Sequence, residues 1–386
     1  MSFRHKILKL KIVRLLSSVK LTVLCLFLLY LLTLSGTVAQ IQDGLYLAQE
    51  RYFESFFFLV FGFIPFPGAQ LVMWVLFCNL LVVALTRFVY KWDRVGITII
   101  HSGLFLFLIS GYVTLHLGQE SHLTLQEGQA ANVSVAYHDW ELAVWQPQVQ
   151  KDPLITENDI TAIDVEYLNS GRSINLNDLG FKLTVKEFYK NCESYTGGDG
   201  DKPLSVMGLT RLEPIPLFKE PEKNMPGGIL TMETSPNQHF DVLLFGGASQ
   251  PVTFEVDGKK YNIVIRLKHY PLPFTLKLKD FKKEDHPGTS MARSFQSRVE
   301  IQIDKVWREK LISMNEPLRY KDFTLYQASF SIDQMGGETS TLAVVKNAGR
   351  LMPYISTFVT FLGLVTHFGM MAFRRRSPKR KEPNDT

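Results

Sequence analysis

The stretch GITIIHSGLFLFLISGYVTLHL, residues 96–117, decides the fold of this chain, because it holds no acidic residue, lysine or arginine. A helix of this length, at about 1.5 Å per residue, crosses the roughly 30 Å hydrocarbon core of a membrane. Backbone groups in lipid must satisfy one another, so the stretch is predicted to be an α-helix. Three further apolar stretches are long enough to do the same: residues 21–39, 69–89 and 351–373. The sequence therefore predicts an integral membrane protein with four spanning helices, three before and one after a large polar region.

The first of these stretches has an alternative interpretation as a cleaved signal peptide. A basic segment precedes residues 21–39, and the small residues Ser35, Gly36 and Ala39 lie at their end. The apolar core of a signal peptide is shorter, about 7–15 residues, and three further spans follow. We therefore expect the segment to remain in the protein as a span.

Charge sets the expected orientation of the chain in the membrane. Hydrophobic residues make up 46% and charged residues 20% of the 386 residues, but the charges are segregated from the spans. Basic clusters precede the first span, separate the second from the third, and follow the fourth: Arg4, Lys6, Lys9, Lys11, Arg14 and Lys20; Arg87, Lys91 and Arg94; Arg374, Arg375, Arg376, Lys379, Arg380 and Lys381. The positive-inside rule predicts that residues 1–20 and 374–386 are cytoplasmic. Basic runs can also bind nucleic acid, but their places beside spans argue against a nucleic-acid partner.

The loop between the first two spans, residues 40–68, is unusually rich in phenylalanine. Its apolar run at residues 56–67 is too short to cross a membrane and contains Pro65 and Pro67. The run is expected either to lie in the membrane interface as an interfacial or re-entrant segment, or to pack as a loop beneath the outer domain.

Residues 118–350 are predicted to form a β-rich domain on the outer side of the membrane. Apolar and polar residues alternate in five stretches: 181–188, 252–256, 261–267, 274–278 and 299–303. This period of two is typical of strands with one buried face. One or two packed antiparallel sheets are expected, with residues 193–228 as a long loop between two halves.

The three cysteines exclude two kinds of redox chemistry for this chain. Cys25 and Cys78 lie inside predicted spans and only Cys192 lies outside. There is no Cys-x-x-Cys pair, so the chain is neither a dithiol reductant nor a c-type haem acceptor. Cys192 is expected to be a buried, unreactive thiol.

Two histidines inside predicted spans are the candidate binding residues. His101 lies about five residues into the third span from its cytoplasmic end, and His367 about six residues before the cytoplasmic end of the fourth. Ionisable residues within a membrane are costly and are functional candidates by default. Neutral imidazole ligates haem iron, so the two could hold one haem or each could pair with a histidine of a partner. The plainer alternative is that each only hydrogen-bonds a neighbouring helix.

The remaining chemistry-bearing residues give weaker signals. Gly103 and Gly111 would let a helix or a flat macrocycle approach closely, and helix packing is the simpler explanation. His116 lies about 22 Å along the helix from His101, so the two cannot ligate one iron. His116 and His122 flank the outer end of the third span, and His116 is expected to be an interfacial histidine. His138, His239, His269 and His286 show no metal-ligand spacing.

Several stretches resemble the ResB family, also called CcsB, of cytochrome c biogenesis proteins. They are residues 16–40, His101-Ser-Gly-Leu-Phe-Leu, residues 286–299 and residues 314–330, and the last, with Asn315-Glu-Pro-Leu and Tyr326-Gln-Ala-Ser, is the most specific. The resemblance extends over nearly the whole chain, including the three-plus-one order of the spans.

The resemblance implies that this chain is a subunit of the System II cytochrome c synthase complex. Proteins of this family act with a ResC or CcsA-type membrane protein to move haem b across the membrane and attach it to apocytochrome c. The family's histidine in the third span matches His101, which would be an axial ligand of the haem iron, with the second ligand from the partner. His367 has no such counterpart and remains a candidate from its position alone. The chain would be a non-catalytic or co-catalytic subunit of this haem lyase, and thiol-reducing proteins of the same pathway are further expected partners.

Two other functions remain open from the residues. A membrane cytochrome or quinone-reactive electron-transfer subunit would use the same histidines, but usually as pairs at two depths. A haem-free assembly scaffold would need none of them. The lack of a Ser-rich, acid-free leader favours a bacterial inner membrane over a thylakoid, with the β-rich domain in the periplasm.

Overall fold

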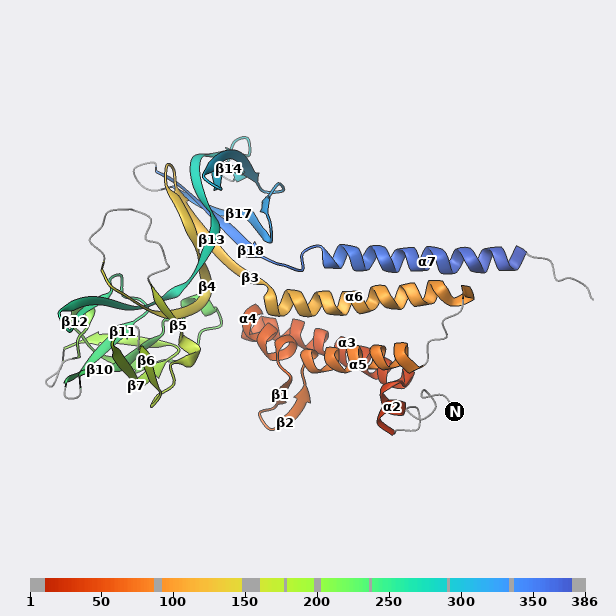
Figure 1. The fold of residues 1–386 in the computed structure, drawn as a ribbon, viewed down its shortest axis with the longest axis horizontal. Coiled ribbons are helices and arrows are strands. Elements are labelled where there is room, and N and C mark those ends of the chain that lie inside the picture. Colours follow the sequence, from red (N-terminus) through yellow and green to blue (C-terminus); the bar gives the residue numbers. More distant parts are fainter. Residues whose placement is uncertain are drawn as a thin grey trace, which may run out of the picture. The chain divides into compact units, whose positions relative to one another are not determined.

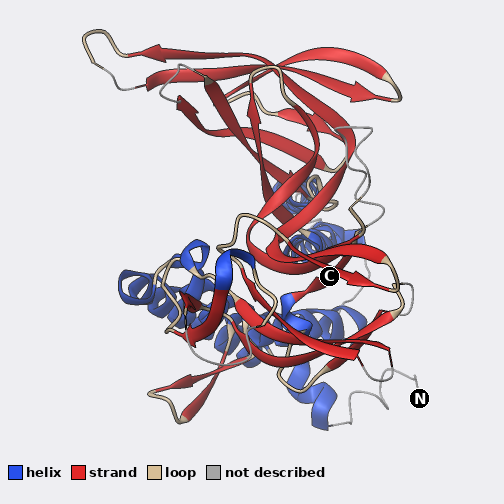
Figure 2. Ribbon diagram, turned by 90° about the vertical axis from the view of Figure 1, so that its left-hand side faces the viewer, coloured by secondary structure: helices blue, strands red, loops and turns tan. Residues whose placement is uncertain are grey.

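The computed structural model of the chain describes residues 11–86, 92–147, 160–176, 179–197, 203–235, 238–289, 292–332 and 337–376. The chain divides into two compact units, one of residues 1–118 with 347–386, and the other of residues 119–346. Figure 2 separates the two classes of secondary structure, with the long helices in the first unit and most strands in the second. The basic residues expected before position 11, at 87–91 and after 376 lie outside the described residues.

The first unit contains the predicted apolar helices. They are α3 (Val19–Asp43), α5 (Ala69–Thr86), α6 (Val95–Leu117) and α7 (Met352–Arg376) (Figure 1). The short helix α2 (Lys11–Leu16) precedes α3, and the 3-10 turn η2 (Trp92–Arg94) directly precedes α6. In the described part of the chain, four helices are long and apolar enough to cross a membrane, which confirms the four predicted apolar segments. Helix α3 continues beyond the predicted end at residue 39 and stops at Gly44, whose φ of 80° ends the helical geometry.

Helices α6 and α7 run antiparallel in close contact through small residues. A Cβ built on Gly96 would lie 2.5 Å from the backbone nitrogen of His367, and one on Gly363 would lie 2.6 Å from that of Ile100. Two turns further along α6, a Cβ on Gly103 would lie 2.7 Å from the backbone nitrogen of Thr360. Glycine is required at these points because any side chain would force the helix backbones apart. The helix-packing explanation of Gly103 is thus the one that the structure supports.

The phenylalanine-rich loop is more structured than expected. It contains α4 (Leu45–Gln49), the π-helix η1 (Glu50–Glu54), and a hairpin of β1 (Phe57–Val60) and β2 (Ile64–Pro67) that extends away from the helices (Figure 1). The hairpin turns at Phe61 and Gly62, both with positive φ. The side chains of Phe61 and Phe63 are 83% and 72% exposed, so the tip of this hairpin is an apolar surface.

The second unit is the large β-rich domain that the alternation predicted. Its strands are β3 (Gln119–Gln126), β4 (Ala130–Trp145), β5 (Thr161–Asp164), β6 (Ser173–Leu176), β7 (Phe181–Tyr189), β8 (Cys192–Thr196), β9 (Leu209–Pro214), β10 (Gly227–Ser235), β11 (Gln238–Phe245), β12 (Val252–Val256), β13 (Lys259–Asp285), β14 (Ala292–Ile303), β15 (Val306–Ser313), β16 (Leu318–Tyr320), β17 (Phe323–Ile332) and β18 (Glu338–Lys346). Short 3-10 turns lie at Val165–Tyr167, Val206–Gly208 and Pro221–Lys223.

These strands pair into three sheets within the described residues. A ten-stranded sheet has the order β15-β14-β13-β4-β3-β18-β17-β16, with β12 and β5 paired beside it, and a four-stranded sheet has the order β11-β10-β7-β6. The third sheet is the hairpin β8–β9. It corrects the expectation of a plain loop at residues 193–228, because Cys192 to Thr196 and Leu209 to Pro214 pair despite their weak alternation.

Strand β13 merges two strands that the sequence separated. The predicted strands 261–267 and 274–278 belong to one strand, Lys259–Asp285, although Pro271 and Pro273 lie between them. Proline removes a ladder donor, and the pairing of β13 with β4 accordingly shifts register between Pro271 and Leu276. Beyond the prolines, the opposite edge of β13 pairs with β14 from Thr275 onward, so the strand continues with a second partner.

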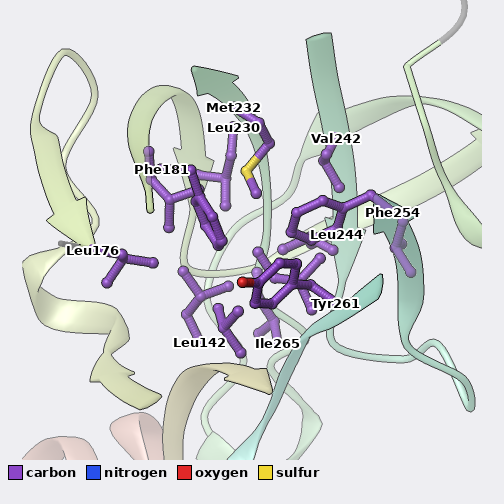
Figure 3. Packing of buried hydrophobic residues seen from close by; sticks show 14 of the residues in the cluster. Leu142, Leu176, Phe181, Leu230, Met232, Val242, Leu244, Phe254, Tyr261 and Ile265 are labelled. Atoms are coloured by element: carbon purple, nitrogen blue, oxygen red, sulfur yellow. The ribbon is translucent and has the colours of Figure 1, made fainter. Parts of the chain in front are cut away.

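Two hydrophobic cores share the long strands β4 and β13. One core lies where the first half of β13 meets the four-stranded sheet, with Phe181, Phe254 and Tyr261 in mutual ring contact (Figure 3). The other lies within the large sheet, around Leu276, Leu325 and Leu342. Burial of large apolar side chains in both cores is the main stabilising contribution to this unit.

Candidate functional site

His101 lies on the face of α6 that points toward α5. At about 100° per residue, His101, Phe105, Tyr112 and His116 fall within about 60° of one another around the helix. Phe105 stacks on Phe77 of α5 with ring centroids 4.7 Å apart, and Tyr112 meets Trp74 of α5 edge-on at 5.3 Å. Aromatic contacts therefore fix this stripe of α6 against α5, and the stripe carries one histidine near each end of the helix.

The ring of His101 is oriented by its own helix. Its Nδ1 lies 2.8 Å from the carbonyl oxygen of Ile97, one turn earlier. A carbonyl only accepts, so Nδ1 carries the proton and the lone pair of the neutral ring is on Nε2. Metal-bound histidines commonly donate their other ring N–H to a backbone carbonyl in this way. The half-buried imidazole of His101 thus fits the role of an axial ligand.

His367 is not brought to the same place as His101. The backbone of His367 packs against Gly96, and His101 lies five residues further along α6, about 140° around the helix and about 7.5 Å along it. The crossing of α6 and α7 is too close at Gly96 for a macrocycle to enter between the helices. One haem ligated by both histidines would have to lie outside this crossing.

His116, at the opposite end of the same stripe, has polar and aromatic neighbours within the first unit. Its Nε2 lies 3.4 Å from Nε2 of Gln70 in α5, and its ring centroid lies 4.4 Å from that of Tyr112. An interfacial position was all that could be predicted for His116 from the sequence, because Gln70 lies 46 residues away and no spacing pattern links the two.

The other histidines form no metal site among the described residues, since no group of three or more metal-ligating side chains occurs there. His122 is the one with a distinctive environment. Its Nδ1 is buried without a hydrogen-bond partner, and its ring lies 5.1 Å from that of Tyr137. Burial lowers the pKa of His122, which favours the neutral form of the ring.

The cysteines are free thiols without redox partners in the described structure. Cys192 is 2% exposed and lies 3.5 Å from the carbonyl oxygen of Met225. Burial raises the pKa of this thiol to about 11, so little thiolate exists at neutral pH. Cys192 is therefore the buried, unreactive thiol that the sequence analysis expected.

Asn79 is a buried polar residue of the apolar helix α5 that no sequence pattern singled out. Its Nδ2 donates to the carbonyl oxygens of Leu16 and Ser18, 2.5 and 3.2 Å away, and its Oδ1 accepts from Thr22 at 2.8 Å. Helix α2 ends at Leu16, so the Leu16 carbonyl lies at a helix end, whereas the Ser18 carbonyl also accepts from the backbone N–H groups of Leu21 and Thr22. Asn79 thus bonds the carbonyl at the end of α2, which lipid could not do, and its role is structural.

The second unit contains a buried polar cluster of Ser297, Gln327 and Ser340, on strands β14, β17 and β18. The hydroxyl of Ser297 donates to Oε1 of Gln327 at 2.6 Å, and Nε2 of Gln327 donates to the hydroxyl of Ser340 at 3.0 Å. Gln327 belongs to the Tyr326-Gln-Ala-Ser stretch of the sequence. A buried, mutually bonded cluster of this kind fixes the register of three strands.

The fold defines a class of protein in which four helices able to span a membrane accompany a large β-rich domain. Residues 246–353, from the end of β11 to the start of α7, match the ResB-like family. The match confirms the resemblance over this segment, which includes residues 286–299 and 314–330 but not His101.

A stretch of 119 residues is also 29% identical to Protein NrfI of Wolinella succinogenes. It makes up 30% of this chain and 13% of the relative, so the chain corresponds to a small part of that protein's length.

Proposed function

We propose that this chain is a subunit of the System II cytochrome c synthase complex, which transports haem across the membrane and presents it for covalent attachment to apocytochrome c. The observation that carries the proposal is the match of residues 246–353 to the ResB-like family, which supports involvement in cytochrome c maturation. The similarity to Protein NrfI adds to it over a short stretch. Haem is the cargo of this reaction, and the chain itself is a non-catalytic or co-catalytic subunit.

His101 is the residue assigned to hold the haem iron during transfer. The bond from Nδ1 to the Ile97 carbonyl supports this role, because it directs Nε2 outward from the α6 backbone. A histidine of a ResC or CcsA-type partner supplies the second axial ligand. His367 is the weaker candidate, since its helix contacts α6 too closely for haem to lie between them.

The proposed location is a bacterial inner membrane, with both termini cytoplasmic and the β-rich domain in the periplasm. In that orientation His101 lies nearer the cytoplasmic side, where haem enters. The β-rich domain then holds apocytochrome c beside the partner's haem, and thiol-reducing proteins of the pathway keep the cysteines of apocytochrome c reduced.

The test is a reduced-minus-oxidised haem spectrum of the chain copurified with its partner, measured for the unaltered protein, His101→Ala and the neighbouring control Ser102→Ala. The Ser102 hydroxyl donates to the carbonyl oxygen of Thr98 within α6, so this control should change neither haem content nor cytochrome c maturation. His101→Ala should lose the haem band and maturation together, and added imidazole should restore both.

Two results would contradict the proposal. Normal haem content and maturation in His101→Ala would favour a haem-free scaffold. Stable haem in this chain purified without any partner would favour a membrane cytochrome.

A further inference from the structure

A cavity of about 680 Å³ lies within the first unit, among the outer parts of α3, α5 and α6 and the short helices α4 and η1. Its volume is within the range of about 300–1,000 Å³ that small-molecule sites occupy. His101 does not line it, so the cavity is separate from the proposed haem position.

The polar residues of the cavity gather at one end. Gln40 lies near the end of α3, Gln70 at the start of α5, and His116 at the end of α6. Because α5 runs antiparallel to α3 and α6, these three positions fall on the same side of the unit. Gln49 of α4 and Glu54 of η1 complete this polar end.

The opposite part of the cavity is apolar and aromatic. Moving into α5 and back along α6, the lining residues become Met73, Trp74, Phe77 and Leu108. Trp74 and Tyr112 stand edge to face across the two helices, with ring centroids 5.3 Å apart. The cavity thus suits a molecule with a flat polar head toward the helix ends and an apolar body directed into the membrane.

The pair of Gln70 and His116 supplies the hydrogen-bonding chemistry. Their Nε2 atoms are 3.4 Å apart, and the two side chains come from different helices. A glutamine amide and an imidazole each donate or accept depending on orientation and tautomer. Together they suit a head group with carbonyl oxygens in one redox state and hydroxyl groups in the other.

Charge decides which amphipathic molecule fits. Among the described residues that line the cavity there is one carboxylate, Glu54, and no lysine or arginine. A phosphate head group or the two propionates of haem would meet a negative charge without a compensating cation. A neutral ring avoids this cost.

We propose that this cavity binds an isoprenoid quinone or quinol, with the ring against the edge-to-face pair of Trp74 and Tyr112 and its oxygens toward Gln70 and His116. The ring is neutral, flat and bordered by two carbonyls or hydroxyls, and its chain is apolar. The proposal goes beyond the assigned role in haem delivery and does not require haem at His101.

The test measures binding of a short-chain quinone to the full-length chain purified in detergent, by quenching of tryptophan fluorescence and by calorimetry. Saturable binding of one quinone per chain is expected. Gln70→Leu and His116→Phe should weaken it at least tenfold, whereas His239→Phe, an exposed histidine in the other unit, should leave it unchanged.

A cavity-filling variant separates loss of binding from loss of folding. A Cβ on Gly111, which lines the cavity, would meet no atom within 4 Å. Gly111→Leu should therefore keep the fold and exclude the quinone.

Absence of saturable quinone binding, or equal binding in Gly111→Leu, would overturn the proposal. So would a His116-dependent haem spectrum, or retention of an anionic phospholipid in native mass spectrometry that Gly111→Leu abolishes. Haem spectra of the same preparations report on His101 independently, so failure of one proposal is distinguishable from failure of the other.

Discussion

Replacing Gly363 with alanine should destabilise the α6–α7 pair, whereas replacing Gly369 on the same helix should not. A Cβ on Gly363 would lie 2.6 Å from the backbone nitrogen of Ile100 and 3.1 Å from the carbonyl oxygen of Gly96. Ordinary contacts between heavy atoms are about 3.5–4.0 Å, so the helices must separate by roughly 1 Å. Backbone atoms cannot rotate away, and overpacking of this kind costs about 1–3 kcal/mol.

The matched position isolates this steric cost. A Cβ on Gly369 would meet nothing within 4 Å, so Gly369→Ala should only gain helix propensity, about 0.8–1 kcal/mol at most. Both substitutions share that gain, and the two variants should therefore differ by about 1–3 kcal/mol in free energy of unfolding.

Unfolding of the purified full-length chain in mixed micelles, with increasing mole fraction of SDS and circular dichroism as readout, measures this difference. Gly363→Ala should have the lower midpoint. If Gly363→Ala is as stable as Gly369→Ala, the inference that α6 and α7 are in backbone contact at Gly363 is refuted.

Three further substitutions test other parts of the structure. Asn79→Ala should cost about 1–3 kcal/mol in the same unfolding assay, since it removes the bonds to the Leu16 carbonyl and the Thr22 hydroxyl, and no loss would contradict its bonding role. Arg266→Met should lower the free energy of unfolding of the full chain, measured by thermal melting, by about 3–5 kcal/mol, because the carboxylate of Glu141 loses its charge partner. Glu141 is 2% exposed and lies 2.8 Å from Arg266. Lys186→Met, in an exposed ion pair, should cost under about 1 kcal/mol, and equal losses in the two variants would refute this distinction. The pKa of His122 is lowered in the folded chain, so the unfolded chain binds a proton at this imidazole more readily. The melting temperature should therefore fall as the pH drops from above about 6.5 through the lower pKa of the folded state. His122→Phe should reduce that fall, and an unchanged pH profile of the melting temperature would exclude His122 as its source.

The strand predictions show where local pattern sufficed. Residues 252–256 alternate with period two and form β12 with the same bounds, because one face of that strand packs on Phe181 and Tyr261. Residues 193–228 did not alternate, yet they contain β8 and β9. Their pairing is stabilised by Cys192 and Leu212 packing against Leu243, a contact between distant segments that no local period records.

The candidate site was predicted in part. The position of His101 within an apolar span marked it from the sequence, since an ionisable residue in lipid is exceptional. The sequence did not indicate that Ile97 orients its ring, that Gly96 blocks the approach of haem beside His367, or that Gln70 lies beside His116. Each of these depends on the rotation of a helix about its axis, which composition leaves undetermined.

The sequence by itself determined that four apolar segments become helices and that the region between the third and fourth is built of strands. It could do so because hydrophobic length and period are local properties, imposed by the spacing of side chains along a helix or strand. Only the tertiary structure decided which faces of those helices meet, that β4 and β13 serve two cores, and that a polar-ended cavity forms beside α6. Those features arise from side chains far apart in the chain, and close packing selects among their arrangements.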